Sequence, residues 1–305
     1  MTTTPIGRLN ILLMLTVIVF WGSSFVVVKI AINEGLTPIA VATSRFLIAG
    51  ALFIAALLIR RSRTRNYRLL VEKKDIPVII LLALTGVTFF FIAQYTGIEM
   101  AGASLAAILV TLLSPIIIAV FSTKMLNERL TRKQASGIGI AALGTLIVIG
   151  GGNPNLTGNM QFFLGSLILL ATPVLWAVYN LFGKKTLERY DPFLVSGYVT
   201  VIGGLGLIPF ALIDNSLSQI ASMSLSSWSA ILFLAVACSL FGYFIWFHVL
   251  KQVGATVTSS FLFIEPLVTV LLAATFVGET LSLYTIVGGV LIFLGVRLIT
   301  RNKLS

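Results

Sequence analysis

The sequence predicts an all-α integral membrane protein with ten transmembrane helices, arranged as two inverted five-helix repeats. Three observations predict this fold class. The chain has 305 residues, of which 58% are hydrophobic and 10% are charged, and its mean hydropathy is +1.05. It contains ten long apolar segments, and its two halves share the spacing of several prolines, glutamates and glycines. A water-soluble domain could not bury so much apolar surface, so the composition excludes an ordinary soluble enzyme.

Each of the ten apolar segments is long enough to cross a bilayer as a helix, which takes about 20 residues. Short connections join them, except for the charged stretch from Arg60 to Asp75. The first segment is too long for a cleavable signal peptide, so we expect it to remain as a mature helix. The expected helices are Ile11–Ala31, Ile39–Ile59, Ile76–Ile98, Ser104–Thr123, Lys133–Gly151, Gln161–Phe182, Pro192–Ile213, Trp228–Leu250, Thr256–Val277 and Leu283–Ile299.

The distribution of lysine and arginine predicts the orientation in the membrane. Nineteen of the 21 lie near the N-terminus, around the even-numbered connections or near the C-terminus, and the odd-numbered connections hold none. Positive charge accumulates on the cytoplasmic side of membrane proteins. We therefore expect a multi-pass protein of the inner or plasma membrane with both termini in the cytoplasm. The expected partners are the lipid bilayer and a small-molecule substrate. The net charge of +11 is explained without nucleic acid as a partner.

Residues that commonly hold metals or cofactors are scarce. Cys238 is the single cysteine and His248 the single histidine, so we expect no disulfide within the chain and no cysteine or histidine metal site. The chain lacks the G-x-x-x-x-G-K-[ST] phosphate loop, which makes direct ATP hydrolysis an unfavourable hypothesis. We expect no metal and no cofactor, and we favour packing at the membrane interface over proton relay for His248.

The two halves of the chain repeat one pattern. A proline, a glutamate and two glycines recur at identical spacings, and a tryptophan and a lysine recur further upstream. The matching residues are Pro115, Glu128, Gly137 and Gly144 with Pro266, Glu279, Gly288 and Gly295, and Trp21 and Lys29 with Trp176 and Lys184. This pattern predicts one repeat in residues 1–155 and a second in residues 156–305. Five spans is an odd number, so the second repeat should cross the membrane in the opposite sense, as in many secondary transporters.

Parts of this pattern have a structural explanation. We expect Glu128 and Glu279 to cap helices or to anchor them at the interface. Thr131 and Gln134 have the spacing of a capping box at the start of the fifth segment. The paired glycines should let the fifth and tenth segments approach a neighbour closely.

Several short motifs carry a family resemblance. They are WGSSFVVVK at Trp21–Lys29, Pro115 with Glu128-Arg129-Leu130, and Phe263-Ile264-Glu265-Pro266 with Gly278-Glu279-Thr280-Leu281. With these motifs the sequence resembles the EamA-type branch of the drug/metabolite transporter (DMT) superfamily over essentially its whole length. Ile264 replaces the usual leucine before Glu-Pro. The resemblance implies a ten-helix inverted-repeat bundle around a central cavity, in a family that moves small metabolites and often exports amino acids.

A carboxylate is the first candidate for the substrate site, because a charge in the membrane costs about 2.5–3.5 kcal/mol and needs a partner or a cavity. Glu265 should lie half-way along the ninth segment, where Pro266 breaks the helix. Such a carboxylate suits binding of a cationic group or protonation, and the alternative is a structural carboxylate that stabilises the broken helix. The equivalent position is Ser114, beside the helix-breaking Pro115, so the halves are chemically unequal there.

Three basic residues are weaker candidates. Lys29 lies near the outer end of the first segment and its repeat mate Lys184 near the inner end of the sixth, where they could reach the interface or contact a substrate carboxylate. For Arg45, in the second segment, we favour a structural role and a pairing with Glu34 or with carbonyl groups at a helix end.

Aromatic and polar side chains at matching positions are expected to line a path for the substrate. Aromatic walls would accept apolar amino acids or other amphipathic solutes, and the alternative is helix packing or an interfacial belt. The candidates for the substrate-binding site are Trp21, Ser24, Gln94, Tyr95, Ser114, Trp176, Tyr179, Asn180 and Trp246, together with Glu265 and Lys29.

These observations favour a secondary transporter that exports amino acids or related small metabolites by alternating access. A proton is one candidate for the coupling ion. Two alternatives stay open, a passive channel or facilitator and a drug efflux protein. A channel would need a ring of like residues or a carbonyl-lined filter, and no such run is visible. An enzyme is not expected, because the chain lacks a credible Ser/His/Asp set.

Overall fold

The computed structural model describes residues 6–64, 67–101, 106, 109–150, 160–277 and 283–300, and all regular secondary structure in these ranges is helical. The predicted all-α fold is confirmed. Six of the described helical stretches are long and apolar enough to cross a membrane: Arg8–Asn33, Pro38–Arg63, Lys73–Ala101, Phe163–Leu187, Pro192–Ile213 and Leu225–Gln252. Shorter apolar helices cover Leu109–Met125, Ala255–Thr269 and Ile286–Thr300.

The described residues form a helix or a run of helices at each of the ten predicted positions. In the first half these are α1 (Arg8–Asn33), α2 (Pro38–Arg63), η1 (Lys73–Asp75) with α3 (Ile76–Ala83), η2 (Leu84–Thr88) and α4 (Phe89–Ala101), η3 (Leu109–Leu113) with α6 (Ser114–Met125), and α7 (Arg132–Gly150). In the second half they are α8 (Met160–Leu187), α9 (Pro192–Ile213) with the short α10 (Ser216–Ala221), α11 (Leu225–Phe233) with η4 (Leu234–Phe241) and α12 (Gly242–Gln252), α13 (Ala255–Ser260) with η5 (Phe261–Ile264) and α14 (Glu265–Val277), and α15 (Leu283–Thr300).

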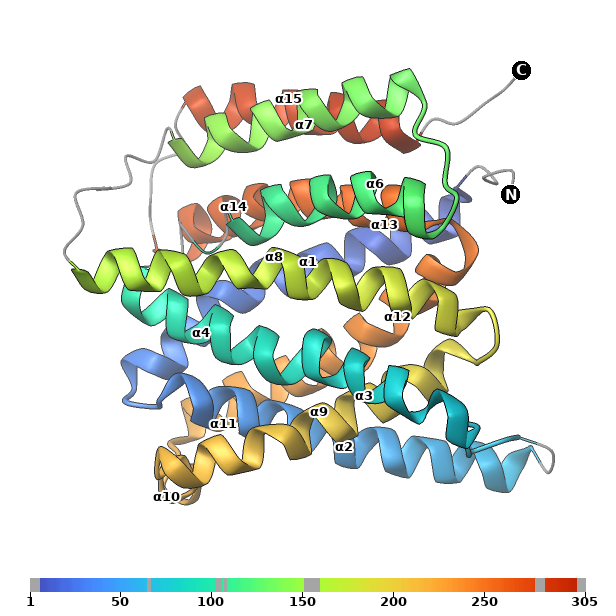
Figure 1. The fold of residues 1–305 in the computed structure, drawn as a ribbon. Coiled ribbons are helices and arrows are strands. Elements are labelled where there is room, and N and C mark those ends of the chain that lie inside the picture. Colours follow the sequence, from blue (N-terminus) through green and yellow to red (C-terminus); the bar gives the residue numbers. More distant parts are fainter. Residues whose placement is uncertain are drawn as a thin grey trace.

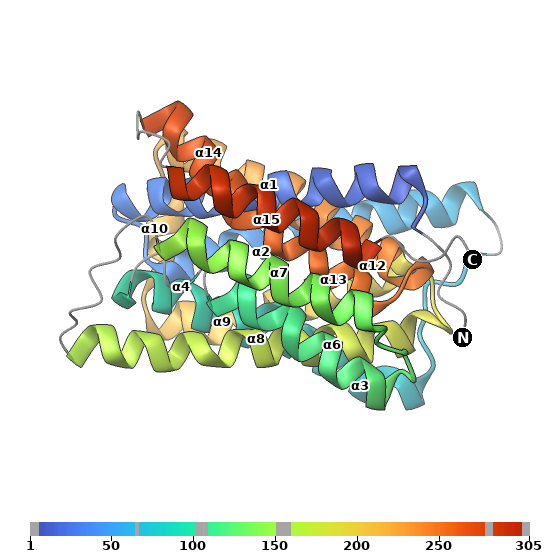
Figure 2. The same ribbon diagram turned by 90° about the horizontal axis from the view of Figure 1, so that it is seen from above.

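Equivalent helices of the two halves run in opposite directions. Figure 1 shows α1 running away from the end of the bundle at which α15 ends, whereas its counterpart α8 runs towards that end. The same relation holds for α2 with α9 and for α7 with α15. α1 begins and α15 ends at the same end of the bundle in both views (Figure 1 and Figure 2), and we call it the terminal end. The described helices therefore have the inverted arrangement that the repeat predicts.

The helix contacts follow a pseudo-two-fold relation between the halves. α2 packs along α9 and α7 along α15, so these two pairs join equivalent helices. The contact of α4 with α8 is matched by that of α12 with α1, and the contact of α1 with α14 by that of α8 with α6. The α7–α15 pair lies at one side of the bundle, at the top in Figure 1 and in front in Figure 2.

The repeated glycines allow the backbones of α7 and α15 to touch. A Cβ atom on Gly144 would lie 2.6 Å from the carbonyl oxygen of Gly288, and one on Gly295 would lie 2.6 Å from the carbonyl oxygen of Gly137. No side chain fits at such distances, so the glycines form the contact itself. The predicted close packing of the fifth and tenth segments is therefore confirmed, and the neighbour of each is the other.

Local signals explain how the helices begin. Thr37 accepts a hydrogen bond from the amide of Ala40 at 3.2 Å and precedes Pro38 at the start of α2. Asp191 plays the same role for α9, with Pro192 as the first residue. Both arrangements combine a side-chain cap with a proline in the first turn. The predicted capping box is present, since the Thr131 amide donates to Gln134 Oε1 and the Gln134 amide to Thr131 Oγ1.

Helix type changes where the sequence predicts broken helices. The π-helical η3 ends directly before Ser114 and Pro115, and the 3₁₀-helical η5 ends directly before Glu265 and Pro266. Each proline occupies the first turn of the following α-helix, where a missing N–H costs little. The chain therefore keeps turning through both positions, with altered hydrogen bonding instead of an open break.

Candidate functional site

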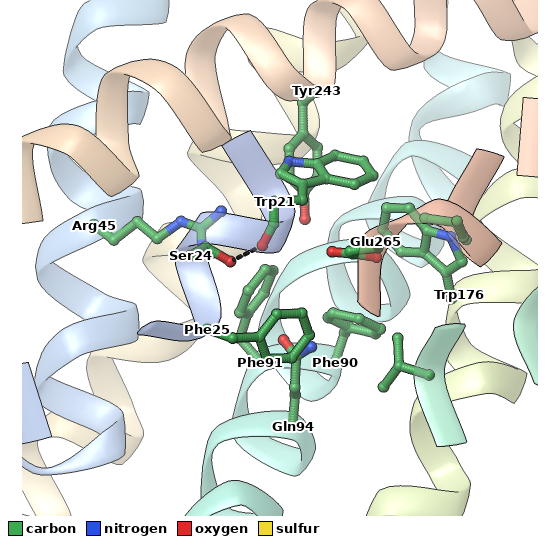
Figure 3. Close-up of a pocket in the computed structure, with 12 residues that line it drawn as sticks. Trp21, Ser24, Phe25, Arg45, Phe90, Phe91, Gln94, Trp176, Tyr243 and Glu265 are labelled. Atoms are coloured by element: carbon green, nitrogen blue, oxygen red, sulfur yellow. Dashed lines mark hydrogen bonds between the residues drawn. The ribbon is translucent and has the colours of Figure 1, made fainter. Parts of the chain in front are cut away.

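A cavity lies between the two halves of the bundle. Its volume is about 40 Å³, which is room for a few ordered water molecules, so the walls have to move apart before a larger solute enters. Figure 3 shows its lining side chains converging from several helices. The lining residues come from both halves. The first half contributes, from α1, α2, α4 and η3, the residues Trp21, Ser24, Phe25, Arg45, Phe90, Phe91, Gln94 and Val110. The second half contributes, from α8, α12, η5 and α14, the residues Trp176, Tyr243, Leu262 and Glu265.

Six of the twelve residues that line the cavity are aromatic. Trp21 and Trp176, which match across the repeat, meet edge to face with centroids 5.5 Å apart. Phe90 packs against Trp176 at 5.2 Å, and Tyr243 lies 6.1 Å from Trp21. The Trp21 Nε1 donates to the carbonyl of Cys238 at 2.9 Å, which fixes the ring across the two halves. These contacts create a rigid, largely apolar surface.

Glu265 places a carboxylate in this cavity. Its side chain is only 5% exposed, and among the described residues it forms no ion pair and accepts no hydrogen bond. In Figure 3 the carboxylate points into the space between the aromatic rings. Glu265 is the first residue of α14, which follows η5 and packs against α1. Its side chain is therefore directed towards α1. A buried carboxylate without a partner is ready to bind a cationic group or a proton.

Arg45 faces the same cavity from α2, which the sequence analysis did not predict. Its Nε donates to Ser239 Oγ at 2.7 Å and its Nη1 to the Tyr95 hydroxyl at 2.8 Å. The expected pairing with Glu34 is wrong. Glu34 lies after the end of α1, where it accepts hydrogen bonds from the hydroxyls of Ser224 and Ser227, whereas Arg45 lies about two turns inside α2.

Two predicted polar residues line the cavity and a third supports it. Gln94 directs its amide into the cavity between Phe90 and Phe91 and has no hydrogen-bond partner among the described residues. Ser24 also lines the cavity, and its hydroxyl donates to the Trp21 carbonyl at 2.7 Å. Tyr95 is buried behind the wall, where it holds Arg45.

Three predicted path residues lie outside the cavity, towards the terminal end of the bundle. Trp246 is fully buried, and its Nε1 donates to Asn180 Oδ1 at 2.8 Å. Tyr179 stacks on Phe247 with centroids 4.7 Å apart. These residues follow the lining residues of α8 and α12 by about one turn, on helices that end at the terminal end. We call Tyr179, Asn180, Trp246 and Phe247 the aromatic seal, because they are buried and pack together between the lining residues and the terminal end.

Ser114 and Lys184 do not line the cavity. Ser114 is fully buried, and its hydroxyl has no hydrogen-bond partner among the residues that the structure describes. Lys184 donates to the carbonyls of Leu250 and Lys251 at 2.6 and 2.8 Å, so it binds the last carbonyls of α12. The Lys29 side chain and Glu279 lie outside the described residues.

The lining residues that sequence reasoning missed share one signal. Phe25 lies one turn after Trp21 on α1, and Phe90 and Phe91 lie one turn before Gln94 and Tyr95 on α4. Residues four apart share a helix face. Extending each candidate by one turn along its helix would therefore have found these phenylalanines. Arg45 differs from them, because the sequence analysis considered it and favoured a structural role.

Comparison with known proteins places this architecture in a family. The model of the EamA-like transporter family matches the chain twice, over residues 8–150 and 163–301. An "Uncharacterized transporter" of Archaeoglobus fulgidus is 30% identical over 96% of this chain and 99% of its own length. A crystal structure at 20% identity aligns with a TM-score of 0.73 over 95% of both chains, which shows a shared fold.

Two further relatives carry more specific names. A "Probable terminal-alkyne amino-acid exporter" of Streptantibioticus cattleyicolor is 26% identical over 96% of this chain and 93% of its own length. A "Probable amino-acid metabolite efflux pump" of Salmonella typhimurium is 27% identical over 93% of this chain and 92% of its own length. The two matches to the family model together span most of the sequence, and the chain belongs to the EamA-like transporter family.

Proposed function

We propose that this transporter exports amino acids or related small metabolites across the inner or plasma membrane by alternating access. The observation that carries the proposal is the carboxylate of Glu265, which has no partner in the described ranges and is buried in an aromatic cavity between two inverted halves. An amino acid would place its ammonium group on this carboxylate and its apolar side chain against the rings. The printed names of the Streptantibioticus and Salmonella relatives support the same substrate class.

The aromatic seal supports alternating access over a continuous pore. A channel would need a route past Trp246 and Tyr179, and both are fully buried and packed. Exchange of the conformations of two inverted halves would open this side and close the other. The cluster of basic residues around the terminal end supports a cytoplasmic location for both termini.

A proton is our candidate for the coupling ion, and Glu265 is its binding site. The charged and titratable side chains that face it across the cavity are Arg45 from α2 and Tyr243 from α12. Cys238 of η4 is also close enough to interact with it electrostatically. Binding of a cationic substrate and of a proton would compete at one carboxylate, which is the simplest form of exchange.

A drug efflux function is the second candidate, favoured by the aromatic walls alone. The rings would accept an amphipathic cation without an α-carboxylate. Amino acids and drugs are therefore compared in one assay.

Counterflow in proteoliposomes tests the proposal. Purified wild type is reconstituted, loaded with one unlabelled amino acid or drug, and assayed for uptake of the same labelled compound over a range of pH. We expect saturable counterflow of at least one apolar amino acid. In Glu265→Gln we expect reduced flux or a lost dependence on pH.

The matched control is Glu99→Gln, which changes an exposed carboxylate on α4 and should transport like wild type. Unsaturable flux of the amino acids would favour the channel, and counterflow of drugs alone would favour drug efflux. Wild-type flux by Glu265→Gln at every pH would remove Glu265 from the mechanism.

A further inference from the structure

We infer that Arg45 is the residue that binds the carboxylate of the substrate, so that the cavity recognises zwitterions by two separate poles. The inference rests on the proposed function and deepens it, because it assigns a second recognition group and a substrate class. Glu265 is the pole for the ammonium group, and Arg45 faces the same cavity from the other half of the bundle.

Arg45 has no ion-pair partner in the part of the chain that the structure describes. A guanidinium keeps its proton under all physiological conditions. The side chain is 2% exposed, and among the described residues it forms no ion pair. Its two hydrogen-bond acceptors, Ser239 and Tyr95, are uncharged hydroxyls. Within the membrane such a charge is costly, so an anionic ligand would stabilise this arrangement.

The guanidinium has donors to spare for a ligand. It carries five N–H groups, and the bonds to Ser239 and Tyr95 use two of them, at 2.7 and 2.8 Å. Three N–H groups remain without a partner among the described residues. A carboxylate can accept two parallel hydrogen bonds from one guanidinium, which is the geometry that arginine provides and lysine does not.

The surroundings hold the guanidinium in place. Its Cζ atom lies 5.0 Å from the centroid of Phe46 and 4.7 Å from that of Phe91. The Tyr95 hydroxyl fixes one nitrogen and Ser239 another, from α4 and η4. Figure 3 shows the end of the side chain directed at the cavity, with Ser24 beside it and Glu265 across the space. A pre-positioned cation of this kind costs little to organise when a ligand arrives.

The cavity carries a negative group, Glu265, and a positive group, Arg45, and the second group distinguishes it from a site that binds any cation. Amphipathic amines need only Glu265 and the rings, whereas amino acids use both poles. Arg45 should therefore decide whether a carboxylate is required, and its removal should turn a zwitterion site into an amine site.

Competition in counterflow tests the inference. Labelled L-phenylalanine is the reporter, and the competitors are L-phenylalanine, L-phenylalaninol, which lacks the carboxylate, and 3-phenylpropionate, which lacks the ammonium group. Wild type should bind the amino acid about 10- to 100-fold more tightly than the alcohol, the range expected for charge-assisted hydrogen bonds. Arg45→Gln should bind both with similar affinity, and Glu265→Gln should weaken both.

Control variants separate recognition from folding. Arg60→Gln removes an arginine from the exposed end of the same helix and should keep wild-type discrimination. Tyr95→Phe removes one support of Arg45 and keeps the charge, so the preference for the amino acid should shrink without disappearing. Arg45→Lys keeps the charge and should retain part of the preference for the amino acid over the alcohol. It allows the role of Arg45 to be measured if Arg45→Gln does not fold.

Each outcome decides between the claims. Equal affinity of wild type for the amino acid and the alcohol would overturn the inference without any variant. If Arg45→Gln still prefers the amino acid over the alcohol as strongly as wild type does, the inference is overturned, whereas the proposed transport of amino acids stands. Failure of wild type to exchange L-phenylalanine or any other amino acid would contradict the proposed function itself, and the inference with it.

Discussion

Glu128 of the first half binds Thr256 of the second half twice, through the backbone amide at 3.1 Å and through the side-chain hydroxyl at 2.8 Å. The same carboxylate accepts the amide of Ala255 at 2.7 Å, so it satisfies free donors at the start of α13. Gly254 precedes them with φ +141, and a Cβ atom there would lie 3.0 Å from Glu128 Oε1. The sequence predicts helix capping by Glu128, and the structure reveals that the capped helix belongs to the other repeat.

We expect Glu128→Ala to weaken the contact between the two halves at the start of α13. The variant leaves the amides of Ala255 and Thr256 without a charged acceptor, a loss of about 1–3 kcal/mol. A lower melting temperature of the purified protein in detergent would confirm the role. Glu188→Ala, which removes an exposed carboxylate near the end of α8, serves as the control. Equal melting temperatures for the two variants would show that the cap does not hold the halves together.

We expect Gly144→Ala to weaken the α7–α15 pair. The new methyl group would lie 2.6 Å from the carbonyl oxygen of Gly288, and overpacking of this kind costs about 1–3 kcal/mol. Thermal unfolding measures the effect. Gly139 provides a control on the same helix, since a Cβ atom there meets nothing within 4 Å. If Gly139→Ala lowers the melting temperature as much as Gly144→Ala, helix contact is not the cause.

We expect Asn180→Leu to loosen the aromatic seal. The leucine cannot accept the hydrogen bond of Trp246 Nε1 and leaves a buried donor unsatisfied. A cysteine at Ser24, in a background in which Cys238 is replaced by serine, reports access to the cavity by reaction with a membrane-impermeant thiol reagent. Labelling from the terminal end should be faster in Asn180→Leu than in the parent. Unchanged labelling would mean that other contacts close this side.

The opposite end of the bundle should respond to acid. Hydrogen bonds from Ser224, Ser226 and Ser227 lower the pKa of Glu34 from its ordinary value of 4.5 to about 2. A lowered pKa contributes stability above the ordinary value, and this contribution is lost as pH falls towards 2. Wild type should therefore lose more thermal stability between pH 6 and pH 3 than the double variant Ser224→Ala, Ser227→Ala. Parallel pH curves for the two proteins would contradict this origin.

The fold was largely predictable from the sequence, because the length of an apolar segment indicates a membrane-spanning helix and the spacing of the repeated residues relates the two halves. The glycines of α7 and α15 even predict where backbones touch. The site was less predictable. Trp21 and Trp176 line the cavity as expected, but Tyr179 and Trp246 lie in the seal, since a sequence indicates the face of a helix and not the depth of a cavity along it.

Arg45 shows the other limit of sequence reasoning. Its partners Tyr95 and Ser239 lie 50 and 194 positions away, and only the packing of α2 against α4 and η4 brings them together. A lone arginine in an apolar segment indicates that a partner or a cavity exists. It does not indicate which one, and the nearest acidic residue along the chain is already bound elsewhere.

Ser114 and Glu265 occupy equivalent positions of the two repeats but carry different side chains, and this difference has a consequence for the direction of transport. A half-length ancestor that paired with its own copy would offer the same side chain at both positions and would treat the two compartments alike. If the halves exchange shapes as proposed, the acid stays with one half, and a solute entering from either compartment meets different chemistry. Under the proposed mechanism this difference would favour one of the two resting forms and so make the rates of efflux and uptake unequal, while the gradient alone sets the end point.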